Sequence, residues 1–120
     1  MSSEARPEVV LDVEQRAGAF VLVLANTGTS TAFCPQVEFD RTLVGLQGSV
    51  VSDLPVWRDL PMLRPGHQIE ILLDLLLAGR GEEQNSFTAT VTYLDGEERA
   101  YSRTYTHDLA LHLSIPTLLM

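Results

Sequence analysis

The feature that most constrains the fold is a threonine-rich stretch from Phe87 to Tyr105 with a turn signal near its centre. Apolar side chains recur at every second position from Phe87 to Tyr93, and threonines fill the positions between them. Such alternation gives a β-strand with one buried and one exposed face. The Asp95-Gly96 pair favours a tight turn into a second strand. The stretch therefore predicts a β-hairpin.

The length of the hairpin loop decides whether Tyr101 faces the core. A two-residue loop, Asp95-Gly96, would turn Tyr101 outward with the threonines. A three-residue loop, Leu94-Asp95-Gly96 with Gly96 in the left-handed conformation, places Tyr101 on the inward face with Val91. We favour the three-residue loop because it directs an aromatic ring toward the core.

Two alternating segments near the start of the sequence predict further strands. The first begins at Val9, and the second begins at Phe20. The second segment is apolar on both faces, as expected of a central strand that is covered on both sides. It ends at Asn26-Thr27-Gly28, where asparagine and glycine suit a turn with positive φ.

The middle of the chain is less regular. Residues 32–40 predict a strand in which Pro35 requires a bulge or an edge position. Residues 41–61 show no clear strand pattern, and Arg64-Pro65-Gly66 predicts a type II turn. The leucine-rich run 71–77 fits a buried helix as well as a strand. We favour a strand because a Pro-Gly turn precedes an alternation that starts cleanly.

These signals predict a single domain in a chain of 120 residues. About seven strands without a long helix indicate an all-β, immunoglobulin-like β-sandwich with antiparallel strands. Cys34 is the only cysteine, so the sandwich has no internal disulfide, and we expect its thiol to be at least half-buried on a strand. We expect a disordered leader at 1–7, the sandwich at 8–109 and an apolar tail at 110–120.

The charge balance disfavours two classes of partner. The net charge is −8, and the eight basic residues are arginines spread singly along the chain. Nucleic acids and anionic membrane surfaces are bound through clustered cations, so neither is an expected partner. No apolar run approaches the roughly 18 residues of a membrane span, and the polar start lacks a signal-peptide core. The sequence leaves localisation open between a cytoplasmic protein, as written, and a domain excised from an anchored or exported one.

The order of these landmarks resembles a known group of domains. The landmarks are Leu-Ala-Asn-Thr-Gly at 24–28, Leu-Arg-Pro-Gly at 63–66 and Thr-Val-Thr-Tyr-Leu-Asp-Gly at 90–96. The chain is similar over roughly residues 8–109 to the bacterial and archaeal disulfide-free immunoglobulin-like domains of the CARDB and NEW3 type. The resemblance implies a fibronectin-like sandwich, usually non-catalytic, of a surface or membrane-linked protein.

Catalytic and metal-binding patterns are missing from the sequence. No serine lies in a nucleophile elbow, and no glycine-rich phosphate loop is present. The histidines at 67, 107 and 112 lack metal-ligand spacing, and the acidic turns at 82–83 and 95–98 do not follow a calcium-loop pattern. We therefore expect no enzyme activity and no cofactor or metal.

Side chains suited to binding a protein lie where the strand pattern fails. Trp57 and Arg58 are of types enriched at interfaces, although Trp57 serves equally well as a lid over the core. Leu72 and Leu76 fall on the face opposite the predicted core side, and Leu113 and Ile115 belong to the apolar tail.

We expect an interaction or spacer module with a protein partner, or one that self-associates through these apolar residues. The alternative is a small domain that binds carbohydrate or calcium through its strand-end loops.

Overall fold

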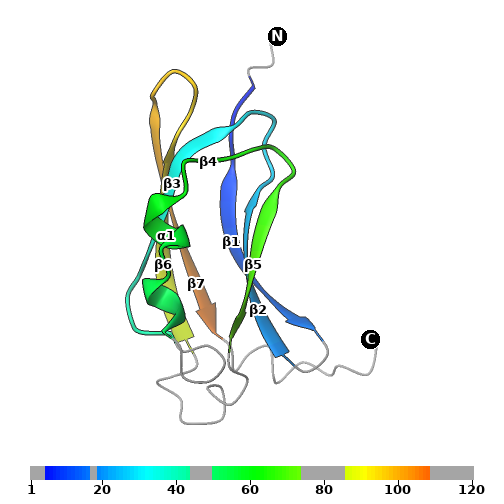
Figure 1. The fold of residues 1–120 in the computed structure, drawn as a ribbon, viewed down its shortest axis with the longest axis vertical. Coiled ribbons are helices and arrows are strands. Elements are labelled where there is room, and N and C mark those ends of the chain that lie inside the picture. The colour runs from blue at the N-terminus through cyan, green and yellow to red at the C-terminus, as the bar shows by residue number, and fades with distance from the viewer. Residues whose placement is uncertain (1–4, 17–18, 44–49, 74–85, 109–120) are drawn as a thin grey trace.

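The chain folds into two antiparallel sheets that lie face to face (Figure 1). The computed structural model describes residues 5–16, 19–43, 50–73 and 86–108. One sheet has the order β1-β2-β5 and the other β4-β3-β6-β7. The strands are β1 (Val9–Arg16), β2 (Ala19–Asn26), β3 (Ala32–Phe39), β4 (Met62–Leu63), β5 (Gln68–Leu73), β6 (Ser86–Leu94) and β7 (Ala100–Asp108). The predicted all-β sandwich of about seven antiparallel strands without a disulfide is confirmed.

The core follows from the alternation along the strands. Residues at every second position of β1, β2 and β6 point between the sheets and are almost fully buried, from Val9 in β1 to Tyr93 in β6. β2 is the central strand of its sheet, as its two apolar faces predicted. Its outward-facing Val21 and Val23 remain only 6% and 4% exposed.

A bulge interrupts β3 at the predicted proline. The pairing of β3 with β6 shifts between Phe33 and Gln36, and Cys34 takes a φ of +52°. Pro35 is buried, whereas the thiol-bearing Cys34 is exposed. The expectation of a half-buried thiol is wrong because the bulge turns this residue out of the strand alternation.

The hairpin of β6 and β7 has the predicted loop length but a different register. Tyr93 pairs with Tyr101, so Tyr101 lies on the inward side, and the two rings stack with centroids 5.1 Å apart. The loop consists of residues 96–98, because Asp95 N donates to Arg99 O. Glu98, and not Gly96, holds the left-handed conformation with φ +68°. The loop therefore lies two residues further along the chain than predicted, and Tyr93 pairs with Tyr101 instead of Glu97.

The segment without a strand pattern forms two short helical turns. η2 (Val51–Asp53) is a 3-10 turn and α1 (Val56–Asp59) is a single helical turn beside β3 (Figure 1). The backbone N–H of His67 donates to the carbonyl of Arg64, and Gly66 between them has a φ of +81°. The predicted type II turn is therefore confirmed. β5 then forms a strand, as predicted; its expected continuation at 74–77 lies outside the described residues.

Asn26 holds three parts of the chain together at the end of β2. Its side chain is 1% exposed, and its Oδ1 accepts hydrogen bonds from Glu8 N and Gly28 N at 3.1 and 2.9 Å. Its Nδ2 donates to Ser30 O and Leu63 O, both at 2.9 Å. All four hydrogen-bonding positions of the side-chain amide are thus occupied.

Gly28 is required by close packing, since its φ is not positive as the sequence analysis proposed. A Cβ at this position would lie 2.6 Å from Glu8 N and nearer still to Arg6 O. Arg6 also exchanges hydrogen bonds with Thr29, at 2.9 and 3.1 Å, and Pro7 is buried. Contacts with the sandwich therefore include residues that the sequence analysis assigned to a leader.

Candidate interaction surface

Trp57 belongs to the core and not to the surface. Its side chain is 1% exposed, and its indole Nε1 donates to Val51 O at 2.6 Å. Its ring meets Phe39 edge-on, with centroids 5.1 Å apart and an interplanar angle of 76°. Of the two functions that the sequence allowed, the structure selects the lid. A buried indole with its only donor satisfied has no surface to offer a partner.

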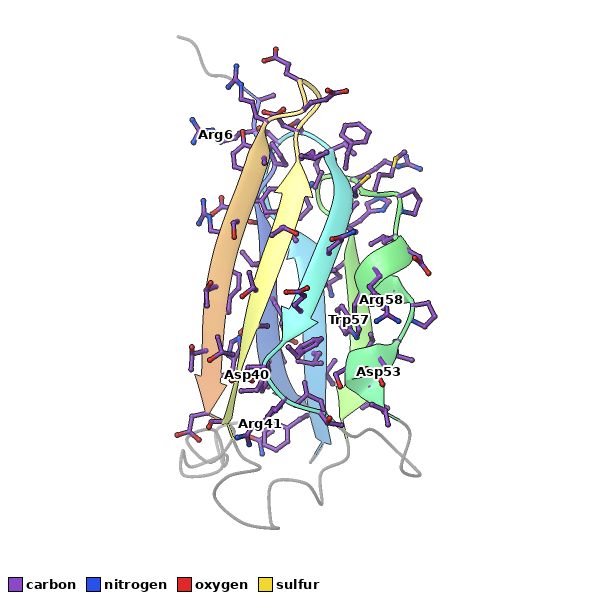
Figure 2. All side chains as sticks on the ribbon, turned by 90° about the vertical axis from the view of Figure 1, so that its left-hand side faces the viewer. Arg6, Asp40, Arg41, Asp53, Trp57 and Arg58 are labelled. Atoms are coloured by element: carbon purple, nitrogen blue, oxygen red, sulfur yellow. The ribbon has the colours of Figure 1, made fainter. Side chains whose placement is uncertain are left out.

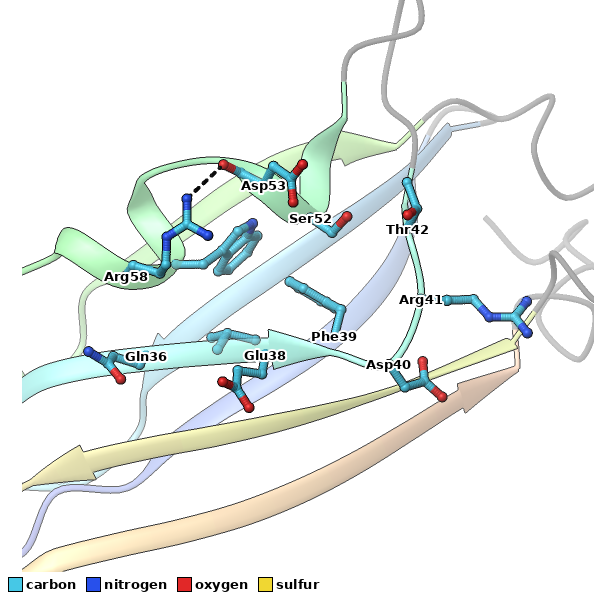
Figure 3. Close-up of a pocket in the computed structure, with 11 residues that line it drawn as sticks. Gln36, Glu38, Phe39, Asp40, Arg41, Thr42, Ser52, Asp53 and Arg58 are labelled. Atoms are coloured by element: carbon cyan, nitrogen blue, oxygen red, sulfur yellow. Dashed lines mark hydrogen bonds between the residues drawn. The ribbon is translucent and has the colours of Figure 1, made fainter.

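Arg58 stands beside a groove between α1 and β3 (Figure 3). The groove has a volume of about 540 Å³, and its lining includes the buried Val37 and Trp57 and the partly buried Phe39. Arg58 is exposed and reaches back to the main-chain oxygen of Asp53 at 3.5 Å. This contact is at the limit of hydrogen bonding, so the guanidinium group is only loosely held.

The groove mixes charges of both signs. Glu38 and Asp40 lie on the β3 side, and Asp53 lies on the opposite wall beside Arg58 (Figure 3). Arg41 stands at the end of the groove. Such a lining favours neither a purely anionic nor a purely cationic ligand. In the described ranges, no group of three or more His, Cys, Asp or Glu is arranged to hold a metal ion.

Leu72 is the other described residue that the sequence singled out. It is 46% exposed on the outward face of β5, where it pairs with Val21 of β2. Leu72 belongs to the three-stranded sheet, whereas Trp57 and Arg58 lie on α1 beside β3 of the four-stranded sheet. Leu76, Leu113 and Ile115 lie outside the described residues.

β7 forms one margin of the four-stranded sheet, a feature that the sequence analysis missed (Figure 2). The backbone N–H of Asp95 donates to the carbonyl of Arg99. Because hydrogen-bonded pairs occur at every second position of an antiparallel ladder, the odd-numbered residues of β7 exchange hydrogen bonds with β6. The N–H and C=O groups of Ser102, Thr104 and Thr106 therefore point away from β6. No backbone hydrogen bond joins these three residues to another described segment.

Side chains of β7 close the seam between the two sheets. Tyr105 donates its hydroxyl to Val9 O at 3.1 Å, and His107 Nε2 lies 2.9 Å from Leu11 O. Burial raises the pKa of Tyr105 above its ordinary value of 10.0. These contacts use carbonyls on the edge of β1. They fix the position of β7 while its own backbone edge remains open.

The outward face beside this edge is rich in hydroxyl groups. Three threonines of β6 stand directly opposite three hydroxyl residues of β7, in the pairs Thr88–Thr106, Thr90–Thr104 and Thr92–Ser102. The hydroxyls of Thr88 and Thr106 lie 3.0 Å apart. None of these six side chains carries a charge, although the chain as a whole is acidic.

The loop before β7 is fixed by the carboxylate of Asp95. It accepts hydrogen bonds from Glu97 N, Arg99 N and the Tyr101 hydroxyl at 2.8, 2.9 and 2.9 Å. The hydrogen bond from Arg99 N is the largest of the effects that hold the pKa of Asp95 below its ordinary value. The hydrogen bond from the Tyr101 hydroxyl to Asp95 raises the pKa of Tyr101. This acidic turn is therefore occupied by internal contacts.

Among the described residues, no helix is long and apolar enough to cross a membrane.

The comparisons with known proteins give a family. No curated protein matches the sequence. One family model matches residues 1–112, and its description is Domain of unknown function (DUF8453). Because this match covers most of the chain, the protein belongs to the DUF8453 family.

Proposed function

We propose that this chain is a non-catalytic, immunoglobulin-like interaction module that binds a protein partner by adding a strand to the free edge of β7. The observation that supports this is the row of unpaired backbone groups at Ser102, Thr104 and Thr106. An extended peptide satisfies such groups with main-chain hydrogen bonds, and the flanking side chains provide selectivity. An open edge of this kind is a template for pairing with another chain.

The other strand edges offer less. On β3, the free groups of Val37 and Phe39 face the groove beside α1, with Trp57 beneath. The edge of β1 is engaged at two carbonyls by Tyr105 and His107. Within the described residues β5 spans six residues and β7 spans nine, so β7 presents the longest regular edge in that part of the chain.

The finer assignment to the CARDB and NEW3 type of immunoglobulin-like domain is also a proposal. The strand order and the type II turn before β5 are compatible with such a module. On this proposal the chain acts as a non-catalytic part of a bacterial surface or membrane-associated protein. Its task is to hold another protein or to space other domains.

Site-specific photocrosslinking tests the proposed surface. A photoreactive residue at Ser102, beside the β7 edge, is compared with one at Asp12, an exposed position on β1 of the other sheet. Both variants are expressed as full-length protein in cells of its source. We expect discrete crosslinked protein species from Ser102 and not from Asp12.

Thr104→Pro is the blocking variant, because proline removes an edge N–H that makes no hydrogen bond within the described fold. Thr104→Val is its matched control, since it keeps the N–H and removes only the hydroxyl. The crosslinks should disappear in the proline variant and persist in the valine variant. Equal crosslinking from Ser102 and Asp12, or crosslinks that survive Thr104→Pro, would refute binding at β7.

A further inference from the structure

We propose that the strand added to β7 is β7 of a second copy of this chain, antiparallel and with Thr104 on the two-fold axis. This inference rests on the proposed function, because it names the partner of the same edge. A two-fold contact between identical edges requires that one strand be complementary to itself. β7 meets this requirement in its length, its hydrogen-bonding positions and its charges.

The length of β7 selects one register. The strand runs from Ala100 to Asp108, and Thr104 is its central residue. With Thr104 opposite its own copy, Ala100 faces Asp108 of the partner copy and all nine residues of each strand are paired. Any other antiparallel register leaves residues unpaired at both ends.

The free hydrogen-bonding groups suit the same register. The outward-directed groups belong to even-numbered residues, including Ser102, Thr104 and Thr106. Placing Thr104 on the axis sets Ser102 opposite Thr106, so even residues meet even residues. These pairs exchange both hydrogen bonds, as antiparallel pairing requires.

The side chains on the inward side are also compatible. In this register Arg103 lies opposite Tyr105 of the second copy, and Tyr101 lies opposite His107. An arginine beside a tyrosine ring gains a cation–π contact. Arg103 is half exposed in the single copy, and among the described residues its ion pair is a 3.9 Å contact with Glu8, so its guanidinium can turn toward a tyrosine ring.

Neighbouring registers are disfavoured. A shift that sets Ser102 opposite Thr104 places Arg103 directly opposite its own copy, and like charges directly opposite one another are destabilising. The opposite shift sets Arg103 against His107, which loses the tyrosine contact. Arg103 is an inward-pointing charge on an edge strand, a feature that limits indiscriminate pairing. Here it selects the register.

The overall charge predicts how salt acts on the pair. Each copy carries −8, so two copies repel one another at long range. Salt screens this repulsion with a Debye length of about 8 Å at physiological ionic strength. The contact itself joins uncharged hydroxyl residues and, on each side, an arginine–tyrosine pair, a tyrosine–histidine pair and Ala100 opposite Asp108, so no two opposite charges face one another. Added salt should therefore strengthen the association, whereas it weakens contacts between opposite charges.

Disulfide trapping at three positions tests the partner and the register together. All variants are full-length and carry Cys34→Ser, which removes the only native thiol. Directly opposed residues of a hydrogen-bonded pair have Cα atoms about 5.5 Å apart, within the range that a disulfide spans. The single variants Thr104→Cys, Ser102→Cys and Thr106→Cys are oxidised mildly, alone and in mixtures. Unfolding midpoints confirm that each variant folds.

We expect Thr104→Cys to crosslink with itself and Ser102→Cys to crosslink only when it is mixed with Thr106→Cys. Adding Thr104→Pro to the Ser102→Cys and Thr106→Cys chains should abolish the mixed crosslink. Self-crosslinking of Ser102→Cys, or no crosslinking of Thr104→Cys, would overturn the inference.

A single concentration-independent monomer in sedimentation would also overturn it. If that monomer still gives the Ser102 photocrosslinks to another protein, only the second copy is rejected and binding at β7 stands. If both experiments fail, both proposals fall.

Discussion

Replacing Asn26 with alanine should remove the four hydrogen bonds that join the residue before β1, the loop after β2 and strand β4. The substitution leaves two backbone N–H groups and two carbonyls without their partner. Only the bond to Leu63 O is fully buried; the other three are partly buried. A buried group left unpaired costs about 1.5 kcal/mol, and a partly buried one that water reaches about 0.5 kcal/mol.

The free energy of unfolding should therefore fall by about 3 kcal/mol. For a domain of this size that is a large part of the total stability, and it lowers the unfolding midpoint by about 12 °C. Urea denaturation followed by circular dichroism measures the change. Thr27→Ala is the matched control, because the Thr27 hydroxyl makes one exposed 3.4 Å contact with Glu8 O. That variant should stay within about 0.5 kcal/mol of the parent.

Asn26→Asp gives a second, pH-dependent readout at the same position. The introduced carboxyl keeps the two acceptor positions but directs an oxygen at the carbonyls of Ser30 and Leu63. Burial and these carbonyls raise its pKa, so the variant should lose more stability at neutral pH than at acid pH. If Asn26→Ala lies within about 0.5 kcal/mol of the parent, or no further from it than Thr27→Ala, the role assigned to Asn26 is refuted.

Three further predictions follow from individual contacts. Gly28→Ala should displace residues 6–8, because the added Cβ would meet their backbone atoms. We expect the free energy of unfolding to fall by about 2 kcal/mol and the Glu8 amide to exchange faster. Unchanged exchange at Glu8 would contradict this prediction. Tyr93→Phe should raise stability by about 1 kcal/mol, since the Tyr93 hydroxyl is buried without a hydrogen-bond partner; a less stable variant in urea denaturation would argue against it. The pKa of Asp95 is lowered in the fold from 3.8, so its contribution is complete above that pH and is lost as pH falls through the folded value. The stability difference between the parent and Asp95→Asn should therefore narrow in acid, and a difference that is constant from pH 2 to 6 would contradict the assigned contacts.

The alternation of side chains was sufficient to predict the sheets. In strand β6, buried residues alternate regularly with half-buried ones. Both faces of β2 are covered, as its composition indicated. Pro35 and the Pro65-Gly66 pair marked a bulge and a type II turn correctly, because proline restricts φ and glycine permits the positive φ that a type II turn requires. The local sequence and the tertiary structure agree at these positions.

The hairpin register was missed because two turn preferences compete. Gly96 suits the left-handed position of a three-residue loop, and this preference places the loop at residues 94–96. Asp95 is equally suited to the first position of a type I turn, where its carboxylate accepts N–H groups from the residues that follow. The structure adopts the second arrangement and places Glu98 in the left-handed conformation.

The candidate surface could not be predicted from the sequence, for a different reason. Trp57 looked suited to binding because its segment has no strand pattern, yet α1 turns the indole onto Phe39. β7 was predicted as a strand, but its position at the margin depends on which segments pair with which. A period-two pattern reports the faces of a strand and not its edges, so unpaired backbone groups become visible only when the whole sheet is assembled.

Amide hydrogen exchange along β7 tests the account most directly. In dilute protein the amides of Ser102, Thr104 and Thr106 should exchange quickly, while those of Arg103 and Tyr105, which bond to β6, should be protected. As the protein concentration rises, the amides at positions 102, 104 and 106 should gain protection in the Thr104→Val protein, which keeps the N–H at position 104. In the Thr104→Pro protein, which lacks that N–H, the amides of Ser102 and Thr106 should stay unprotected. Protection of the three amides that is independent of concentration, or exchange that never slows, would contradict the pairing of β7 with β7 of a second copy.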